Sequence, residues 1–223
     1  MIGIFDSGRG GIASLTVVKK LLPRVDIAYL ADRKNAPYGT KSERELKLLV
    51  RRDIARLREL GAEKILIACC TASSIYYALS ESEQVLCVPI IEPTAKYAAS
   101  LSENGRISVI ATEATVRSGS FSRAIKRARA GAEVFELACQ RLVGMIENLA
   151  KDDVIKEEIL KISHKIRASG CDTLVLGCTH FSHAESIFRD VLGDIKIADS
   201  AAVGALAIAD KIKTEENGKI LYM

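Results

Sequence analysis

Two cysteines of this chain occur in matching contexts. Cys69 and Cys178 each follow a short apolar run of strand length, and each is followed by small polar residues. When the two cysteines are aligned without gaps, Gly61 falls on Gly170 at the start of both segments. Two thiols at equivalent edges of a duplicated structure can face each other, so that one removes a proton while the other delivers one. The spacing therefore points to acid–base chemistry between two thiols.

The surroundings of these cysteines support a chemical role. Each lies just before a segment expected to be helical, and a helix N-terminus stabilises a thiolate. The sequence therefore predicts a lowered pKa for the thiols of Cys69 and Cys178. His180 stands two residues after Cys178, where an imidazole can exchange a proton with the sulfur or orient it.

The other cysteines indicate no site of their own. The chain has no C-x-x-C spacing, which argues against a zinc ribbon or a thioredoxin-type centre, so no metal site is predicted. Three cysteines are expected to be small buried apolar groups: Cys87, Cys139 and Cys171. A redox or metal sensor built on the vicinal pair Cys69-Cys70 is disfavoured, because adjacent cysteines rarely form an unstrained disulfide. A cysteine protease is disfavoured too, because no separate Cys–His–Asn set can be specified.

Strand-like and helix-like segments alternate along the whole chain. Apolar runs of strand length lie at 2–5, 27–31, 64–68, 85–90, 106–111, 132–137, 173–176 and 195–198. Segments with helical spacing lie at 11–22, 42–60, 92–103, 119–130, 140–149, 153–168, 181–192 and 200–213. Such alternation predicts an α/β fold of parallel sheets with helices on both faces. Ser42 and Glu45 form a predicted capping box at the start of the helix 42–60, and Gly61 is expected to end it.

The repeat around the two cysteines predicts two similar α/β units. The first is expected to contain residues 1–93 plus about 200–223 and to carry Cys69, with 219–222 as an edge strand. The second is expected to contain residues 94–199 and to carry Cys178. A second, weaker sequence similarity aligns residues 2–7 with residues 108–113.

Polar side chains follow several of the predicted strands. Ligands in open α/β sheets bind outside the carboxyl ends of the strands. The polar residues expected there are Asp6, Ser7, Asp32, Cys69, Cys70, Thr71, Thr112, Cys178, Thr179, His180, Asp199 and Ser200. The glycine-rich loop 8–11 matches no nucleotide-binding pattern, and its glycines are expected to permit a tight turn between strand and helix.

Composition excludes several classes of function. The net charge is +4 with acidic and basic residues interspersed, and Trp is absent, so a nucleic-acid surface is not expected. The basic stretch 123–129 has the spacing of a solvent-facing helix. No run approaches the roughly 20 apolar residues that cross a membrane, and the N-terminus lacks a leader, so a cytoplasmic protein is expected.

With these residues in place, the chain resembles the cofactor-independent aspartate/glutamate racemase superfamily. The segments that carry the resemblance are Ile2 to Gly11, Tyr29 to Gly39, Ala68 to Ser73, Ile91 to Pro93, Leu176 to Phe181, and Asp199-Ser200. They occur in the family's order and span nearly the whole chain. The resemblance implies two pseudo-symmetric parallel-sheet domains with the active site in the cleft between them.

The resemblance also implies a mechanism and its residues. Cys69 would take the α-proton from one enantiomer of glutamate while Cys178 protonates the opposite face, without cofactor or metal. Asp6 would assist Cys69, and His180 would assist Cys178. The residues that would hold the small amino-acid substrate are Asp6, Ser7, Tyr38, Gly39, Cys70, Thr71, Thr112, Glu147, Thr179 and His180. The family supplies D-glutamate for peptidoglycan, and its members are commonly homodimers.

Several positions depart from the family pattern. Family members generally have Asn where this chain has Cys70, and a thiol is a much weaker donor than an amide. Gln140 and Gly144 replace expected prolines, and Arg9 places a cation where the family has a small or apolar residue. Two alternatives therefore stay open: a racemase or isomerase acting on aspartate or another small dicarboxylate, and a catalytically weakened paralogue that binds a ligand or a partner.

Overall fold

The computed structural model describes residues 1–212 and 220–222, and the strands in this part of the chain form two parallel sheets. The first sheet has the order β4-β3-β1-β2-β9, and the second has the order β6-β5-β7-β8. The strands of the first are β1 (Ile2–Asp6), β2 (Ile27–Ala31), β3 (Lys64–Ile67), β4 (Cys87–Pro89) and β9 (Ile220–Tyr222). The strands of the second are β5 (Arg106–Ala111), β6 (Glu133–Ala138), β7 (Thr173–Gly177) and β8 (Lys196–Asp199). The predicted α/β class is confirmed.

Helices follow most of the strands. The α-helices are α1 (Gly11–Leu21), α2 (Glu43–Glu59), α3 (Cys70–Ser73), α4 (Glu81–Leu86), α5 (Ile91–Leu101), α6 (Glu113–Ser118), α7 (Ser120–Ala128), α8 (Gln140–Glu147), α9 (Asp152–Ala168), α10 (Glu185–Leu192) and α11 (Ser200–Ala209). The 3₁₀ helices are η1 (Arg33–Asn35), η2 (Tyr38–Thr40), η3 (Tyr76–Ala78) and η4 (Thr179–Ala184). Within the described residues, no helix has the length and apolar character to span a bilayer.

The predicted elements are present with some differences. The helix predicted at 181–192 is wrong at its start, because η4 precedes α10 there. The short helices α3, α4 and α6 were not predicted, because one or two turns carry little periodic signal. The predicted edge strand is confirmed over 220–222, where β9 pairs with β2. Residue 219, and residue 213 at the end of the helix predicted at 200–213, lie outside the described residues.

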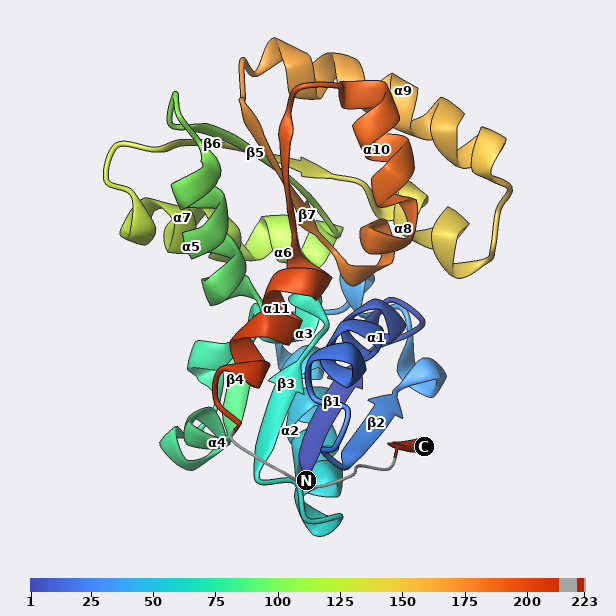
Figure 1. The fold of residues 1–223 in the computed structure, drawn as a ribbon, viewed down its shortest axis with the longest axis vertical. Helices are drawn as coiled ribbons and strands as arrows, with labels where there is room; N and C mark the ends of the chain where they lie inside the picture. The colour runs from blue at the N-terminus through green and yellow to red at the C-terminus, as the bar shows by residue number, and fades with distance from the viewer. Residues whose placement is uncertain (213–219, 223) are drawn as a thin grey trace.

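The two sheets repeat one topology. Strands β1, β2, β3 and β4 have the same order in the first sheet as β5, β6, β7 and β8 have in the second, with β9 added at the edge beside β2. Figure 1 shows the second sheet above the first, with α11 running from the end of β8 back along the first sheet. The predicted duplication is therefore present as a repeated strand order. The predicted boundary at residue 93 stays a prediction, because α5 crosses it and packs against both α7 and α11.

The strand register corrects the predicted alignment of residues 2–7 with residues 108–113. Ile2 pairs with Lys64 in the first sheet, and Ile107 pairs with Thr173 in the second. Lys64 and Thr173 are equivalent in the cysteine alignment, so Ile2 corresponds to Ile107. The predicted alignment of Ile2 with Ser108 is wrong by one residue, and such a slip exchanges the side chains that face the two sides of a sheet.

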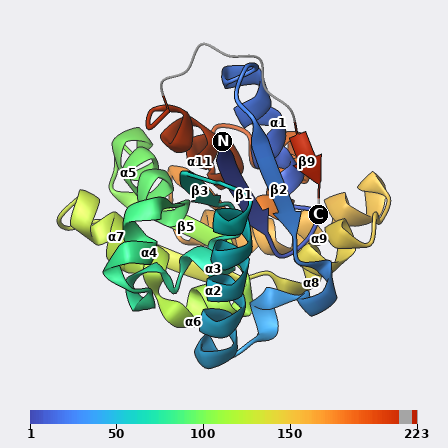
Figure 2. The same cartoon turned by 90° about the horizontal axis from the view of Figure 1, so that it is seen from below.

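The two cysteines occupy equivalent faces of equivalent strands. Side chains alternate between the faces of a sheet, and Ile65 on β3 packs against α2 in the same core cluster as Cys69. Leu174 on β7 packs against α9 and α10 in the same cluster as Cys178. The opposite faces are covered by α1 and α11 in the first sheet and by α5 and α7 in the second. Figure 2 shows the first sheet between α2 on one side and α1 with α11 on the other.

Helix α2 forms as the sequence predicts. The Ser42 hydroxyl accepts a hydrogen bond from the Glu45 backbone, and the Glu45 carboxylate accepts one from the Ser42 N–H, so the capping box is confirmed. Such a cap contributes about 1 kcal/mol to stability. Gly61 follows the helix with φ +88°, a conformation that favours glycine. The buried face of α2 also carries the charged residue Asp53, which is fully buried and must therefore have polar partners.

Candidate active site

Cys69 lies beside a serine at the carboxyl ends of β3 and β1. Its Sγ atom is 3.3 Å from the Oγ atom of Ser7, and both side chains are largely buried. Ser7 follows β1 directly, and β1 pairs with β3, so the register of these two strands brings the hydroxyl to the sulfur. The corrected register makes Thr112 the equivalent of Ser7 in the second sheet.

The predicted lowering of the thiol pKa is wrong for Cys69. Burial raises the pKa of the Cys69 thiol to about 12, and the nearby Asp6 carboxylate acts in the same direction. Helix α3 is only four residues long, so its dipole offsets little of this cost. Cys69 is therefore a neutral thiol at neutral pH, and in this state it can donate a proton.

Cys178 has a different partner. The Nδ1 atom of His180 lies 3.5 Å from its Sγ atom, and the Nε2 atom of the same ring bonds to the Glu147 carboxylate. Glu147 also accepts a hydrogen bond from the backbone N–H of Arg9 at 3.1 Å. The carboxylate thus orients the imidazole, and the imidazole faces the sulfur. The residue after Cys178 begins a 3₁₀ helix rather than the expected α-helix.

The charge state of His180 follows from these contacts. Burial disfavours the imidazolium, but Cys178, Glu147 and Asp6 outweigh this effect and raise the pKa of His180 to about 11. The hydrogen bond from His180 in turn holds the pKa of Glu147 below its usual range. The ring is therefore a cation at neutral pH, and it can donate a hydrogen bond to the Cys178 sulfur.

Asp6 lies behind the pocket and connects two loops. Its carboxylate is fully buried and accepts hydrogen bonds from the backbone N–H of Gly8 at 2.8 Å and from the Thr179 hydroxyl at 2.9 Å. It is not among the residues that line the pocket. The structure thus gives Asp6 contacts to the loops that carry Ser7 and Cys178 and no open path to a ligand.

The structure does not bring Cys70 to the pocket. Its side chain is 1% exposed, packs in the core cluster of α5 and β5, and donates from Sγ to the Ser200 hydroxyl at 3.4 Å. The β3–α3 turn directs Cys69 and Cys70 to different sides, so only the first thiol faces the pocket. The predicted contact between Cys70 and a substrate therefore has no geometry to support it.

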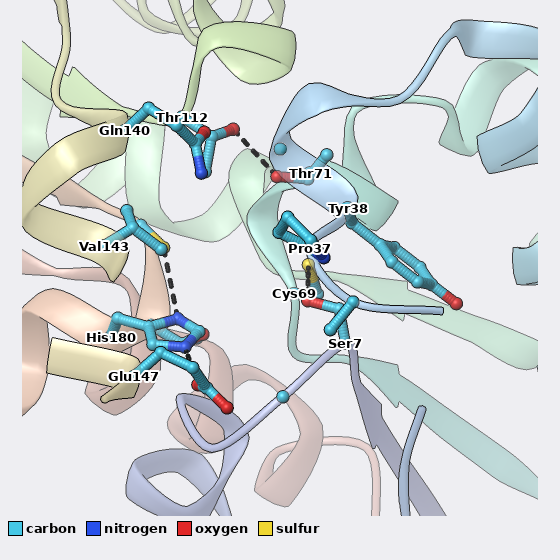
Figure 3. A pocket seen from close by; sticks show the side chains of 15 residues that line it. Ser7, Pro37, Tyr38, Cys69, Thr71, Thr112, Gln140, Val143, Glu147 and His180 are labelled. Carbon is cyan, nitrogen blue, oxygen red and sulfur yellow. Dashed lines mark hydrogen bonds and ion pairs between the residues drawn. The ribbon is translucent and has the colours of Figure 1, made fainter. Parts of the chain in front are cut away.

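The remaining predicted residues line one pocket between the two sheets. Its cavity volume is about 40 Å³. It is lined by Ser7, Gly8, Ala36, Pro37, Tyr38, Gly39, Cys69, Thr71, Thr112, Gln140, Val143, Glu147, Cys178, Thr179 and His180. Figure 3 shows Cys69 and Ser7 on one side of this space and His180 with Glu147 on another. The structure thus brings together the residues predicted to act on or hold the substrate, except Asp6 and Cys70. Three other polar residues expected at strand ends also lie outside the lining: Asp32, Asp199 and Ser200.

The loop that carries Tyr38 is held by buried carboxylates. The Tyr38 hydroxyl donates to Asp32 at 2.7 Å and lies 3.0 Å from Asp53 Oδ2, and Figure 3 shows it pointing away from Cys69. Arg52 bonds to both carboxylates. The hydroxyl is therefore not free to bind a ligand, and Tyr38 meets the pocket through its other atoms. This contact positions Gly39, the next residue of the loop.

Three hydroxyls meet beside the pocket, and two of them, those of Thr71 and Thr112, belong to its lining. Thr71 Oγ1 is 2.9 Å from Thr112 Oγ1 and 3.2 Å from Thr115 Oγ1, and the last two are 2.8 Å apart. Thr71 comes from the first half of the chain and Thr112 from the second, so the contact joins the two halves at the pocket. Hydroxyls can rotate to donate to a bound carboxylate.

Close approach explains the glycine-rich loop better than turn geometry does. The chain does turn here from β1 to α1, but Gly10 has a negative φ, so its backbone conformation alone does not require glycine. A Cβ atom on Gly10 would lie 2.4 Å from Thr179 Oγ1 and 2.7 Å from the backbone nitrogen of His180. The missing side chain lets this loop pack directly against the Cys178 segment.

Sequence reasoning missed five lining residues: Gly8, Ala36, Pro37, Gln140 and Val143. Gly8, Ala36 and Pro37 adjoin predicted site residues along the chain, so proximity in sequence could have indicated them. Gln140 follows the carboxyl end of β6, where a ligand contact is expected, and it was noted only as a departure from a proline.

The arrangement suits proton transfer at a small molecule. In residues 1–212 and 220–222, no group of three His, Cys, Asp or Glu side chains has the geometry of a metal site. A neutral thiol lies on one wall of the pocket, and a second sulfur beside an imidazolium lies on another. A carbon atom held between them has a proton donor and a proton acceptor within reach.

Comparison with known proteins gives a consistent result. The model of the Asp/Glu/Hydantoin racemase family matches residues 18–208. A glutamate racemase of Aquifex aeolicus is 35% identical over 222 residues, covering 98% of this chain and 86% of that protein. The crystal structure of glutamate racemase isoform RacE1 from Bacillus anthracis is similar with a TM-score of 0.94 and 28% identity, covering 100% and 87% of the two chains. The structure of glutamate racemase from Francisella tularensis in complex with D-glutamate has a TM-score of 0.88 and 25% identity, covering 99% and 86%.

Proposed function

This chain belongs to the Asp/Glu/Hydantoin racemase family, and on that premise we propose that it interconverts L- and D-glutamate by moving the α-proton between Cys69 and Cys178. It is an isomerase. The observation that carries the proposal is that both thiols line one small pocket, each with its own polar partner. Glutamate is the substrate named for the similar proteins, including one solved with D-glutamate.

The geometry suggests how the reaction proceeds for one enantiomer. Cys178, as the thiolate beside the His180 imidazolium, takes the α-proton, and the C–H electron pair remains on the substrate as a carbanion-like centre. Cys69 then gives its thiol proton to the opposite face of that carbon. The products are the mirror-image amino acid, a Cys178 thiol and a Cys69 thiolate, so atoms and charge balance. The roles reverse for the other enantiomer.

Charge on the flattened carbon must be stabilised without an electron-sink cofactor. Preorganised donors around the carboxylate supply this stabilisation. Thr71 and Thr112 are hydroxyl donors of the lining, and the Gly39 N–H is an amide candidate beside them. Asp6 and Glu147 position the two loops and the imidazole.

The test is racemisation by the purified chain. Circular dichroism is expected to show the optical activity of D-glutamate and of L-glutamate decaying to zero. Cys69→Ser and Cys178→Ser are each expected to remove racemisation. Cys171→Ser is expected to keep it, because Cys171 lies outside the pocket and its thiol bonds to the Ile166 carbonyl. Glutamate binding with no change in optical activity and no exchange of the α-proton with solvent deuterium would reject the proposal in favour of a binding role.

Aspartate is the competing substrate. Chiral chromatography with both enantiomers of aspartate and glutamate decides between them, and a larger kcat/KM for aspartate would replace the glutamate assignment. A supply of D-glutamate for peptidoglycan, a cytoplasmic location and a homodimer are part of the same proposal, drawn from the family resemblance.

A further inference from the structure

We propose that Gln140 recognises the side-chain carboxylate of the substrate, an inference that rests on the proposed function and identifies one determinant of its specificity. Gln140 is the first residue of α8 and lines the pocket. Figure 3 shows its amide reaching into the pocket beside Thr112. Neither the sequence resemblance nor the mechanism gives this side chain a role.

The amide of Gln140 lacks partners. Its Oε1 atom is buried without a hydrogen bond, and the described residues show none to its Nε2 atom either. Buried polar atoms are nearly always paired, and an unpaired one costs free energy, so this exception requires an explanation. A ligand that enters the pocket can bond to this amide, and a carboxylate, which only accepts hydrogen bonds, does so through the Nε2 donors.

The amide also lies against the loop that carries Gly39. A Cβ atom on Gly39 would lie 2.4 Å from Gln140 Oε1 and 2.8 Å from the Cβ atom of Thr112. Gly39 therefore allows close contact between its loop and both of these residues. With Oε1 turned toward Gly39, the Nε2 donors are left for the pocket.

The other lining residues supply no equivalent donor. The lining contains neither Lys nor Arg, and the ring nitrogens of His180 already face Cys178 and Glu147. A dicarboxylate bound there must be held by neutral donors, and a side-chain amide offers two N–H groups. Gln140 is thus the one lining side chain with free N–H donors in the described part of the chain.

Sheet order indicates which carboxylate Gln140 meets. Thr112 follows β5, the neighbour of the β7 strand that carries Cys178, while Gln140 follows β6, one strand further away. With strands about 4.8 Å apart, the backbone at Gln140 stands roughly 10 Å from that at Cys178. Thr112 is thus placed near the reacting carbon, and Gln140 is placed at the reach of a substrate side chain.

The experiment compares Gln140→Met and Gln140→Glu with the wild type and with Arg141→Met, an exposed neighbour on the same helix that lies outside the pocket. Loss of a hydrogen bond to a charged group is expected to raise KM for D- and L-glutamate about tenfold in Gln140→Met, with kcat within about threefold. Gln140→Glu is expected to raise KM further through like-charge repulsion. Arg141→Met is expected to match the wild type.

Norvaline, which has the same chain length without the distal carboxylate, serves as a competitor. Its inhibition constant is expected to be the same for the wild type and Gln140→Met. A KM for Gln140→Met within about twofold of wild type, or an equal weakening of glutamate and norvaline, would overturn the assignment.

Failure of the proposed function can be distinguished from failure of the Gln140 assignment. A wild type that binds glutamate by calorimetry without racemising it rejects the function. The assignment of Gln140 then stands if Gln140→Met weakens that binding and Arg141→Met does not, and it is rejected if both bind as the wild type does. A wild type that neither binds nor racemises glutamate rejects both proposals.

Discussion

Thr179 donates a hydrogen bond from its hydroxyl to the carboxylate of Asp6, with 2.9 Å between Oγ1 and Oδ2. The bond joins the loop after β7 to the end of β1, and it therefore connects the two repeated halves directly beneath the pocket. Thr179 lies between Cys178 and His180 in the chain. Its position consequently controls the placement of both.

Replacement of this threonine tests the connection. Thr179→Val preserves the shape of the side chain but removes a bond from a fully buried carboxylate, so we expect the free energy of unfolding to fall by about 1–3 kcal/mol. We also expect kcat for glutamate to fall about ten- to a hundredfold, because small displacements of reacting groups are costly. Denaturant unfolding and steady-state racemisation measure the two effects. The control is Thr16→Val, where the exposed hydroxyl bonds only to the Ile12 carbonyl and the change is expected to be small. Equal stability losses in the two variants would contradict the connection.

The close contact of Gly39 gives a second prediction. Gly39→Ala would place a Cβ atom 2.4 Å from Gln140 Oε1 and 2.8 Å from the Cβ atom of Thr112. The Gln140 side chain can turn away, but the Thr112 Cβ atom is fixed to its backbone, so the loop must move away from Thr112 and the pocket changes shape. We expect kcat/KM to fall at least about tenfold in a racemisation assay, with the fold retained. The control is Gly144→Ala on α8, where the added Cβ atom meets no atom within 4 Å. This change is expected to stabilise the protein by about 0.5–1 kcal/mol without loss of activity. Full activity in Gly39→Ala would show that the contact is not needed for the reaction.

The raised pKa of His180 predicts a pH-dependent stability. Its pKa of about 11 in the folded state lies above the ordinary value of 6.5, so its contribution is complete below about pH 6.5 and is lost as the pH rises toward 11. We expect the free energy of unfolding to fall with pH across this window. His180→Gln should reduce the slope by up to about 1.4 kcal/mol per pH unit. Parallel curves for the wild type and His180→Gln would show that the imidazole is not held as a cation.

Much of the fold could be predicted from sequence because its signals are local or repeated. Continuous apolar runs marked buried parallel strands, and the capping box at Ser42 marked the start of α2. The matching segments around Cys69 and Cys178 indicate the duplication, because two equivalent strands bury side chains on the same face and so have the same residue pattern. The predicted alignment of residues 2–7 with residues 108–113 is one residue out of register, because short apolar strands do not fix their own pairing.

The site was less predictable where tertiary contacts decide it. The strand-end position and the family resemblance predict a substrate contact for Cys70, yet the turn after β3 directs this side chain into the core. The pKa of the Cys69 thiol depends on burial by distant segments, which no local pattern reports. Gln140 was noted only as a departure, since its unpaired amide becomes visible only when Gly39 and Thr112 are placed around it.

The unlike neighbours of the two sulfurs have a kinetic consequence. Mirror-image amino acids have equal free energies in water, so the catalytic efficiencies toward them must be equal at every pH. A hydroxyl beside Cys69 and an imidazolium beside Cys178 can therefore produce only compensating differences, in which the enantiomer with the faster turnover also has the higher half-saturation concentration. The pocket is chemically asymmetric, yet at low substrate concentration it converts the two enantiomers with equal efficiency. A preference for one enantiomer appears only at saturating substrate concentration.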